Sequence, residues 1–172
     1  MMGAGKSTVG RALAKRLNWE FIDLDHEIEA VTGVRIPVIF EIEGESGFRK
    51  RESQVLADVV LRPRLILATG GGVVIDPENR ALLKANGDVI YLRASAEDLY
   101  QRTRNDKSRP LLQTDNPRQK IQELLNVREA LYDEVANCKV NTGRQPVSQI
   151  AHHIISSLAL SANDNGPNNH EH

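Results

Sequence analysis

The residues with the clearest chemistry stand at the start of the chain, in Met2-Gly3-Ala4-Gly5-Lys6-Ser7-Thr8. Closely spaced glycines let backbone N–H groups turn inward around a polyphosphate, because no Cβ stands in the way. Lys6 can place a positive charge on the β- and γ-phosphates, and the Ser7 hydroxyl can ligate Mg²⁺. Apolar residues follow at helical spacing over residues 9–18, so the phosphates would rest on a helix N-terminus. The pattern predicts that the chain binds a nucleoside triphosphate.

The full phosphate-loop motif has a further glycine five residues before Gly5, and a strand before that glycine. In this sequence the position of that glycine falls one residue ahead of Met1. We therefore expect a shortened chain whose start was assigned too late, at Met1. The upstream reading frame should then encode about five or six apolar, β-branched-rich residues that end in glycine. Loss of such a strand from the middle of a sheet would cost ~1.5–3 kcal/mol for each buried apolar side chain.

An acidic pair, Asp23 and Asp25, stands at the end of a short strand predicted over residues 20–24. Residues two apart in a strand point to the same side, and ligands bind at the carboxyl ends of parallel strands. One carboxylate can hold Mg²⁺ through water, and the other can accept a proton from an attacking hydroxyl. The alternative is that Asp25 only caps the helix that it precedes.

Glycines and arginines suggest a second ligand site. Gly70-Gly71-Gly72 directly follows a predicted strand, and three glycines in a row exceed what a flexible turn requires. Arg49 stands three residues before Glu52 on a helix face. The two residues could form an ordinary surface salt bridge, or Glu52 could hold Arg49 in place to bind a carboxylate. The same two alternatives apply to Arg128. The segment 106–112 joins a basic cluster to a proline, as a lid that closes an arginine on a phosphoryl group would require.

Helical and extended segments alternate between these residues. The predicted strands are residues 20–24, 64–69, 89–92 and 138–142. The predicted helices are residues 25–32, 37–42, 47–61, 77–85, 96–104, 118–135 and 147–160, and a loop covers 105–117. This alternation predicts an α/β fold with a parallel sheet and helices on both faces.

Composition limits the class of protein. The 172 residues suit one domain, at residues 1–160, followed by a polar, disordered tail at 161–172. A net charge of −1 argues against nucleic-acid or anionic-membrane partners, and no apolar run reaches the ~20 residues of a membrane span. The lone Cys138 excludes an internal disulfide and suits a reducing cytosol. We expect a cytoplasmic monomer.

Taken together, these residues resemble the shikimate kinase family. The matching motifs occur in the family's order and spacing from Met1 to about Leu160: Gly3-Ala4-Gly5-Lys6-Ser7-Thr8, Asp23-Leu24-Asp25, Gly47-Phe48-Arg49 with Glu52, Gly70-Gly71-Gly72, Arg109-Pro110-Leu111-Leu112, and Arg128 with Leu131-Tyr132. The resemblance implies a three-layer, nucleoside-monophosphate-kinase-like P-loop fold. In the family this fold has a five-stranded parallel sheet, whose first strand is missing here, a substrate-binding segment (about 25–54) and a lid (about 105–117). It also implies ATP-dependent phosphorylation of the shikimate 3-hydroxyl, a step of chorismate and aromatic amino-acid biosynthesis.

The resemblance also implies a role for each matching residue on the nucleotide side. The phosphates of ATP would be held by Gly3, Ala4, Gly5, Lys6, Ser7 and Thr8. Mg²⁺ would bind Ser7, with Asp23 reaching it through water. Arg109 resembles the lid arginine that meets the ATP phosphates. Arg102 would pack on adenine beside the turn at residues 142–146, where Arg144 or Gln145 is the expected contact.

On the acceptor side, Arg49 and Arg128 would grip the shikimate carboxylate. Backbone at Gly70, Gly71 and Gly72 would support the substrate. Asp25 would hydrogen-bond the shikimate hydroxyls and orient or deprotonate the nucleophile, so the implied catalytic residues are Lys6, Asp25 and Arg109.

Two other functions stay open at this point. A different small-molecule kinase of the same fold, such as a gluconate kinase, would share the phosphate loop and the lid. It would not be expected to carry Gly47-Phe48-Arg49 with Glu52, or three consecutive glycines. A non-catalytic binding protein should have lost Lys6, Asp25 or an arginine, and all of these are present.

Overall fold

The computed structural model describes residues 1–106, 110–143 and 145–164, in which helices and strands alternate along the chain. The strands are β1 (Glu20–Asp23), β2 (Leu65–Ala68), β3 (Ile90–Arg93) and β4 (Cys138–Asn141). The helices are α1 (Lys6–Leu17), α2 (Leu24–Thr32), α3 (Ile36–Val59), α4 (Pro77–Asn86), α5 (Ala96–Thr103), α6 (Pro117–Val135) and α7 (Val147–Asp164). Every predicted strand and helix has its counterpart, and the α/β class is confirmed.

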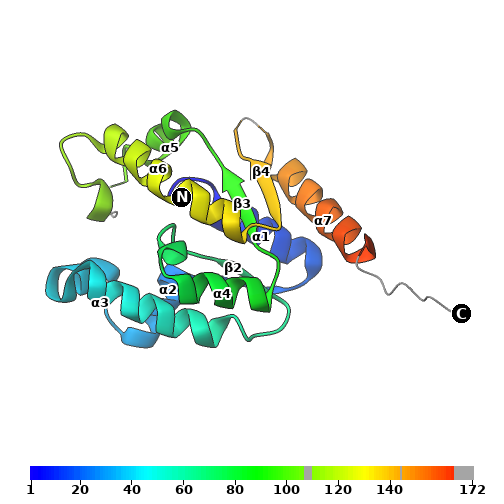
Figure 1. Cartoon of the computed structure of the whole chain (residues 1–172), viewed down its shortest axis with the longest axis horizontal. Coiled ribbons are helices and arrows are strands. Elements are labelled where there is room, and N and C mark those ends of the chain that lie inside the picture. Colours follow the sequence, from blue (N-terminus) through cyan, green and yellow to red (C-terminus); the bar gives the residue numbers. More distant parts are fainter. Residues whose placement is uncertain (107–109, 144, 165–172) are drawn as a thin grey trace, which may run out of the picture.

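The strands pair in parallel, as the alternation predicted. β1 pairs with β2 from Glu20 opposite Leu65 onward, and β3 pairs with β4 from Ile90 opposite Cys138 onward. Among the described residues, no ladder joins β2 to β3, so the hydrogen-bonded sheet is divided into two pairs. Figure 1 shows β2 in the lower half of the molecule and β3 and β4 in the upper half.

Helices cover both faces of the strands in two groups. α1 packs against α7 and β2, whereas α4, α6 and the short 3-10 turn η1 (Val73–Ile75) contact one another. The buried core includes Leu13 of α1, Leu56 of α3, Leu99 of α5, Ile121 of α6 and Ile154 of α7. Met1 is also buried, and Figure 1 places the N-terminus among the helices.

Capping side chains explain where the helices begin. The carboxylates of Asp23 and Asp76 accept hydrogen bonds from backbone N–H groups in the first turns of α2 and α4. Ser95 and Asn116 do the same for α5 and α6. These residue types are the favoured N-caps, because their side-chain oxygens satisfy helix N–H groups that have no partner within the helix.

α3 joins the two helices predicted over residues 37–42 and 47–61. The interruption between them is real, since Gly44 has φ 68° and ψ −174°, outside the helical region. A kink at this glycine therefore separates the first turns of α3 from the part that carries Phe48, Arg49 and Glu52.

Two short 3-10 turns were not predicted. One is η1, directly after the three glycines, and the other is η2 (Pro110–Leu112), within the segment interpreted as a loop. α7 continues to Asp164, about one turn past its predicted end, because each added residue extends an existing helix with one more hydrogen bond. The predicted tail beyond this point, residues 165–172, lies outside the described residues.

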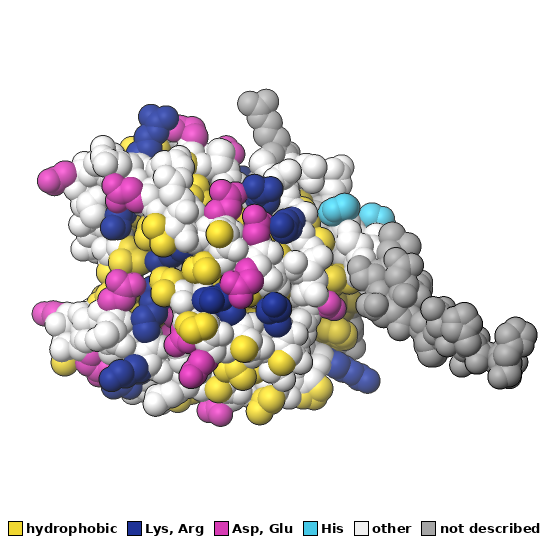
Figure 2. All heavy atoms as spheres, viewed as in Figure 1, with side chains coloured by type: hydrophobic (Ala, Val, Ile, Leu, Met, Phe, Trp, Pro, Cys, Tyr) yellow, Lys and Arg dark blue, Asp and Glu magenta, His cyan; other side chains and the backbone are white. Residues whose placement is uncertain are grey.

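The surface does not present one sign of charge. Figure 2 shows Lys and Arg side chains interspersed with Asp and Glu side chains across the face in view, in line with a net charge of −1. Over the ranges that the structure describes, no helix is both long enough and apolar enough to cross a bilayer.

Candidate active site

The phosphate loop runs into the first turn of α1. Gly5 is the N-cap of α1 in a left-handed conformation (φ 89°), and Gly3 also has a positive φ of 73°. Residues with a side chain rarely adopt this conformation, so both glycines are required by the backbone path. No side chain among the described residues caps α1. Its first N–H groups therefore point toward the loop, which favours an anion at this position.

Lys6 lies over this loop. Its Nζ donates a hydrogen bond to the Met1 carbonyl at 2.5 Å. The ammonium group therefore lies against the start of the loop that would hold a polyphosphate in the predicted arrangement.

Ser7 and Asp23 come together as the sequence predicted. The Ser7 hydroxyl donates to Asp23 Oδ2 at 2.6 Å, while Asp23 Oδ1 accepts from the backbone N–H of Asp25. Mg²⁺ prefers oxygen ligands and is commonly held by one or two protein groups together with substrate phosphates and water. The described residues contain no cluster of three or more His, Cys, Asp or Glu that would hold a metal alone. The donor set thus fits a Mg²⁺ ion that arrives with a nucleotide.

The interpretation of the acidic pair needs two corrections. β1 ends at Asp23 and α2 begins at Leu24, so Asp25 lies in a helix and the alternation of strand side chains does not apply to it. The N-cap of α2 is Asp23 and not Asp25, so the alternative role of Asp25 as a cap is wrong. Asp25 instead points toward the glycine turn, since a Cβ built on Gly70 would lie 3.3 Å from Asp25 Oδ1.

Arg49, which is partly exposed, forms an ion pair with Glu52 on α3. Glu52 is fully buried, and its Oε2 accepts a hydrogen bond from Arg49 Nη1 at 2.6 Å. Arg49 Nη2 also donates to Glu45 at 3.0 Å. The alternative of an ordinary surface salt bridge is therefore wrong. Among the described residues, Arg49 Nε and Glu52 Oε1 are buried and have no hydrogen-bond partner, so the pair retains polar atoms that a ligand can satisfy.

Burial and charge act in opposite directions on this pair. Burial raises the pKa of Glu52, and the positive charges of Arg49 and Arg128 offset part of that rise. For Arg49, burial disfavours the charged form, but the charges and hydrogen bonds of Glu52 and Glu45 together outweigh it and raise the pKa of Arg49. Arg49 thus stays a cation within a largely enclosed site.

The three glycines are explained by close packing. A Cβ on Gly70 would lie 2.8 Å from Glu52 Oε1, and a Cβ on Gly72 would overlap the guanidinium group of Arg49. At Gly71 the carbonyl accepts a hydrogen bond from the Tyr132 hydroxyl at 2.5 Å. The glycines let the turn lie directly against the charged side chains, so a merely flexible turn does not account for them.

Arg128 and Tyr132 lie on consecutive turns of α6, and Tyr132 reaches the glycine turn. Both side chains are buried, and Arg128 lies close enough to lower the pKa values of Glu52 and Tyr132. Burial outweighs this effect and raises the pKa of Tyr132 to about 12, so the phenol remains a donor. The contact between Tyr132 and Gly71 and the contact between Glu45 and Arg49 were missed at the sequence level. The i,i+4 spacing of Glu45 and Arg49 was the available signal for the second.

Arg102 links the phosphate loop to the turn after β4. Its Nη2 donates to the carbonyls of Thr142 at 2.5 Å and Gly143 at 3.1 Å, and its Nη1 donates to the Gly3 carbonyl at 3.3 Å. Arg102 therefore lies beside the turn at residues 142–146, where the sequence analysis expects it. Gln145 is exposed in that turn. Arg109 and Arg144 lie outside the described residues.

Comparisons with known proteins agree on one family. A family model described as "Shikimate kinase" matches residues 2–159. Curated proteins named shikimate kinase from Ralstonia nicotianae and Burkholderia lata are 55% and 56% identical over 160 residues, which cover 93% of this chain and 84% and 87% of theirs. A solved structure, shikimate kinase from Acinetobacter baumannii in complex with shikimate, superimposes with a TM-score of 0.90 at 51% identity, covering 94% of this chain and 89% of that chain.

Proposed function

Because the chain belongs to the shikimate kinase family, we propose that it transfers the γ-phosphoryl group of ATP to the 3-hydroxyl of shikimate. The products are ADP and shikimate 3-phosphate. The observation that carries the proposal is that a charged cluster and the phosphate loop meet at the glycine turn. Arg49 lies against Gly72 and Met1 lies against Gly71, while the buried Arg128 acts electrostatically on Glu52, the partner of Arg49. A kinase for a small anionic acceptor needs these two features side by side.

Arg49 and Arg128 recognise the carboxylate of the acceptor. A guanidinium group can bind a carboxylate through two parallel hydrogen bonds, and Arg49 Nε is buried without a partner among the described residues. Glu52 holds Arg49 in place and limits its rotation. Backbone groups at Gly70, Gly71 and Gly72 support the ring of the substrate from the other side.

Asp25 acts on the nucleophile. Its carboxylate faces the glycine turn and so lies beside the proposed acceptor site. There it orients the 3-hydroxyl and accepts its proton as the oxygen bonds to the γ-phosphorus and the bond from phosphorus to the bridging oxygen of ADP breaks. Lys6 and Arg109 balance the negative charge on the phosphoryl oxygens, since phosphoryl transfer depends mainly on positioning and electrostatic stabilisation.

ATP binds with Mg²⁺ on the loop formed by residues 1–8. Ser7 and Asp23 would hold the ion, directly and through water, and the ion would neutralise phosphate charge there. Arg102 packs on adenine together with Arg144 or Gln145. We further propose a cytoplasmic monomer, with a substrate-binding segment at about 25–54 and a lid at about 105–117 in one domain of residues 1–160.

A coupled assay of ADP release tests this function in the purified chain. Shikimate, quinate, gluconate and no acceptor are compared at equal concentration with ATP and Mg²⁺. We expect release with shikimate, and ³¹P NMR should show one new phosphomonoester at the 3-position. Equal release with gluconate, or release that does not depend on an acceptor, would contradict the proposal.

A further inference from the structure

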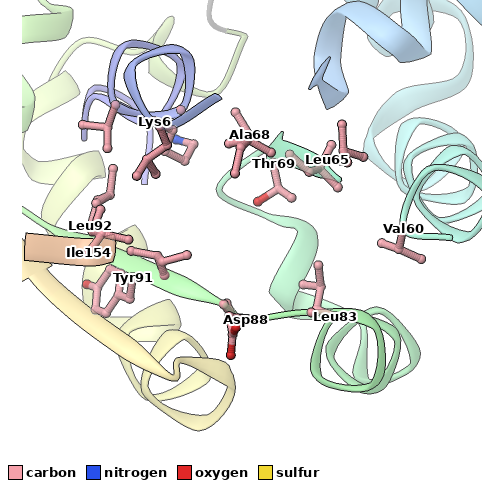
Figure 3. Close-up of a pocket in the computed structure, with 18 of the residues that line it drawn as sticks. Lys6, Val60, Leu65, Ala68, Thr69, Leu83, Asp88, Tyr91, Leu92 and Ile154 are labelled. Carbon is pink, nitrogen blue, oxygen red and sulfur yellow. The ribbon is translucent and has the colours of Figure 1, made fainter. Parts of the chain in front are cut away.

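The main chain that follows β2 is held by side chains from α4. β2 ends at Ala68, and the glycine turn at residues 70–72 leads through η1 into α4. Figure 3 shows Ala68 and Thr69 where the chain leaves β2, and Leu83 on α4. We call residues 70–75, the glycine turn together with η1, the turn segment. Three consecutive glycines allow this main chain many conformations, because glycine has no Cβ to restrict φ and ψ.

Each of the three glycine carbonyls accepts one hydrogen bond. The donors, in chain order, are the backbone N–H of Val73 at 3.3 Å, the Tyr132 hydroxyl at 2.5 Å and the backbone N–H of Ile75 at 3.0 Å. A peptide group is planar, so a held carbonyl also fixes the direction of the N–H group of the following residue. The orientation of the glycine turn therefore depends on Tyr132 and on the shape of η1.

The shape of η1 depends in turn on α4. η1 is a single 3-10 turn, so its own carbonyls have no later helical residue to bond. The carbonyls of Val73, Val74 and Ile75 accept instead from Asn79 Nδ2 at 3.1 Å and from Arg80 Nη1 at 2.9 Å and 3.2 Å. All six carbonyls of the turn segment are thus engaged, three of them by two adjacent side chains.

Asn79 is buried although half of its amide group has no partner. It is 2% exposed, and its Oδ1 is buried without a hydrogen-bond partner among the described residues. A buried, unsatisfied polar atom destabilises a fold, and an apolar side chain of similar size would avoid that loss. The hydrogen bond from Nδ2 to the Val73 carbonyl is therefore the contribution that an apolar side chain could not make at this position.

Arg80 connects η1 to the helix that also holds the glycine turn. Its Nε donates to Glu134 Oε1 of α6 at 3.1 Å, and its side chain is 17% exposed. Tyr132, which holds the Gly71 carbonyl, lies two residues earlier on the same helix. α6 thus reaches the turn segment at two points, directly at Gly71 and through Arg80 at η1.

We propose that Asn79 and Arg80 are positioning residues for the acceptor: they fix the carbonyls of η1, and through them the orientation of the glycine turn. The inference rests on the proposed function, in which the backbone of this turn supports shikimate. A turn that is already held in one orientation does not have to be ordered when the acceptor binds, and this favours binding. The two side chains act through the main chain and take no part in the chemical step.

Steady-state kinetics of Arg80→Met test the proposal. Methionine keeps an apolar stem but cannot donate a hydrogen bond. The KM for shikimate should rise about 10-fold, because two carbonyls lose their donor, while kcat and the KM for ATP change little. Arg80→Lys keeps one cationic donor and should give an intermediate KM. The matched control is Arg93→Met, since Arg93 also pairs with α6, through Glu129 at 2.7 Å, but lies at the end of β3.

Asn79→Leu tests the second contact. It keeps the volume of the side chain, removes the donor to Val73, and should raise the KM for shikimate about 2- to 10-fold. Thermal melting of each variant identifies a merely structural role, in which stability falls and the KM for shikimate stays the same. That result would overturn the proposal, as would an equal rise in both KM values. Arg80→Met decides the matter if Asn79→Leu does not fold.

Amide hydrogen exchange without ligands separates this inference from the proposed function. Exchange at residues 71–75 should be faster in Arg80→Met than in the unchanged chain, and Arg93→Met should not alter it. Unchanged exchange in Arg80→Met would show that Arg80 does not hold the turn, and would overturn the inference. Absence of shikimate-dependent turnover in the unchanged chain would instead reject the proposed function.

A double variant checks that the two contacts hold the same segment. Arg80→Met combined with Tyr132→Phe should raise the KM for shikimate by less than the product of the two single effects, because a turn loosened at one point gains less from the other. A KM equal to that product would mean that the two side chains act independently, and would contradict a shared role through the turn segment.

Discussion

The acceptor side of the site is formed mainly by side chains, whereas the nucleotide side is formed mainly by the main chain. On the acceptor side, buried side chains dominate: Glu52 is fully buried, Arg128 is 3% exposed, and Arg49 lies against the glycine turn. On the nucleotide side, the main chain dominates, with Gly3 and Gly5 in positive-φ conformations ahead of a helix that has no side-chain cap among the described residues.

This difference separates selectivity from general affinity. Main-chain N–H groups bind any polyphosphate, because they recognise charge and not the shape of a particular molecule. Arg49 is held by the buried Glu52 before a ligand arrives, and a ligand without a carboxylate would leave its buried Nε unsatisfied. We infer that the identity of the acceptor is decided at α3, α6 and the glycine turn.

The largest expected effect on turnover comes from a substitution of Asp25, which we place between the acceptor side and the nucleotide side. Asp25→Asn should lower turnover with shikimate by about 10²–10⁴-fold, because the amide cannot accept the proton of the nucleophile. The affinity for ATP should change little. Steady-state kinetics with both substrates measure this, with Glu27→Gln on the same helix as the control. Near-normal turnover of Asp25→Asn would remove Asp25 from the mechanism.

The second prediction concerns the two arginines on the acceptor side. Arg49→Ala and Arg128→Ala should each weaken shikimate binding about 10- to 150-fold, as expected for the loss of a charge-assisted hydrogen bond. ATP binding without acceptor should stay the same, as calorimetry can show. Arg51→Ala is the matched control, since Arg51 pairs with Glu43 on the surface of the same helix. Loss of ATP binding with shikimate binding kept would reverse our division of the site.

The third prediction addresses the nucleotide side. Arg102→Ala removes the side chain that joins Gly3 to Thr142 and Gly143, and should raise the KM for ATP about 10-fold with little change in the KM for shikimate. Arg104→Ala, an exposed neighbour, serves as the control. An equal rise in both KM values would mean that the two sides are not independent.

The smallest effect concerns how the glycine turn is held. Tyr132→Phe removes the hydrogen bond to the Gly71 carbonyl and should raise the KM for shikimate about 2- to 10-fold, since a neutral hydrogen bond contributes about 0.5–1.5 kcal/mol. The kcat should fall less. Tyr100→Phe on α5 is the control. A larger fall in kcat than in affinity would instead assign Tyr132 to the chemical step.

Tyr132 also makes a prediction about pH. Burial raises its pKa to about 12, whereas an unfolded tyrosine ionises near pH ~10. The fold therefore favours the neutral phenol, and this contribution is fully present below pH ~10 and lost as the pH rises toward 12. Chemical unfolding at pH 8 and pH 11 should show a smaller loss of stability for Tyr132→Phe than for the unchanged chain. Equal losses would contradict the assignment.

Local patterns were sufficient to predict the elements and those contacts of the candidate site that join residues close in the chain. Asp, Ser and Asn caps, prolines in first helical turns and the alternation of apolar segments are short-range signals, and each has a local physical cause. The phosphate loop is equally local, since its glycines, lysine and serine are adjacent in the chain. The pairing of Arg49 with Glu52 also followed from helical spacing.

What the sequence could not reveal depends on three-dimensional contacts. Strand alternation was applied from Asp23 to Asp25 because the predicted strand ran one residue too far, whereas the change from strand to helix occurs between Asp23 and Leu24. Glu52 is buried by the packing of the folded chain, and the hydrogen bond from Tyr132 to Gly71 joins residues far apart in the chain. No local pattern encodes such distances.

The kink at Gly44 has a consequence for heredity. Its φ of 68° with ψ of −174° belongs to a region that is essentially reserved for glycine, although a Cβ there would meet nothing within 4 Å. Any other residue at this position therefore introduces backbone strain of about 1–3 kcal/mol without a steric clash. Cells that carry such an allele should grow at low temperature and fail to grow at high temperature, although no side chain of the active site has changed. A genetic screen would then identify the kink at position 44 as a feature that keeps Arg49 and Glu52 in place.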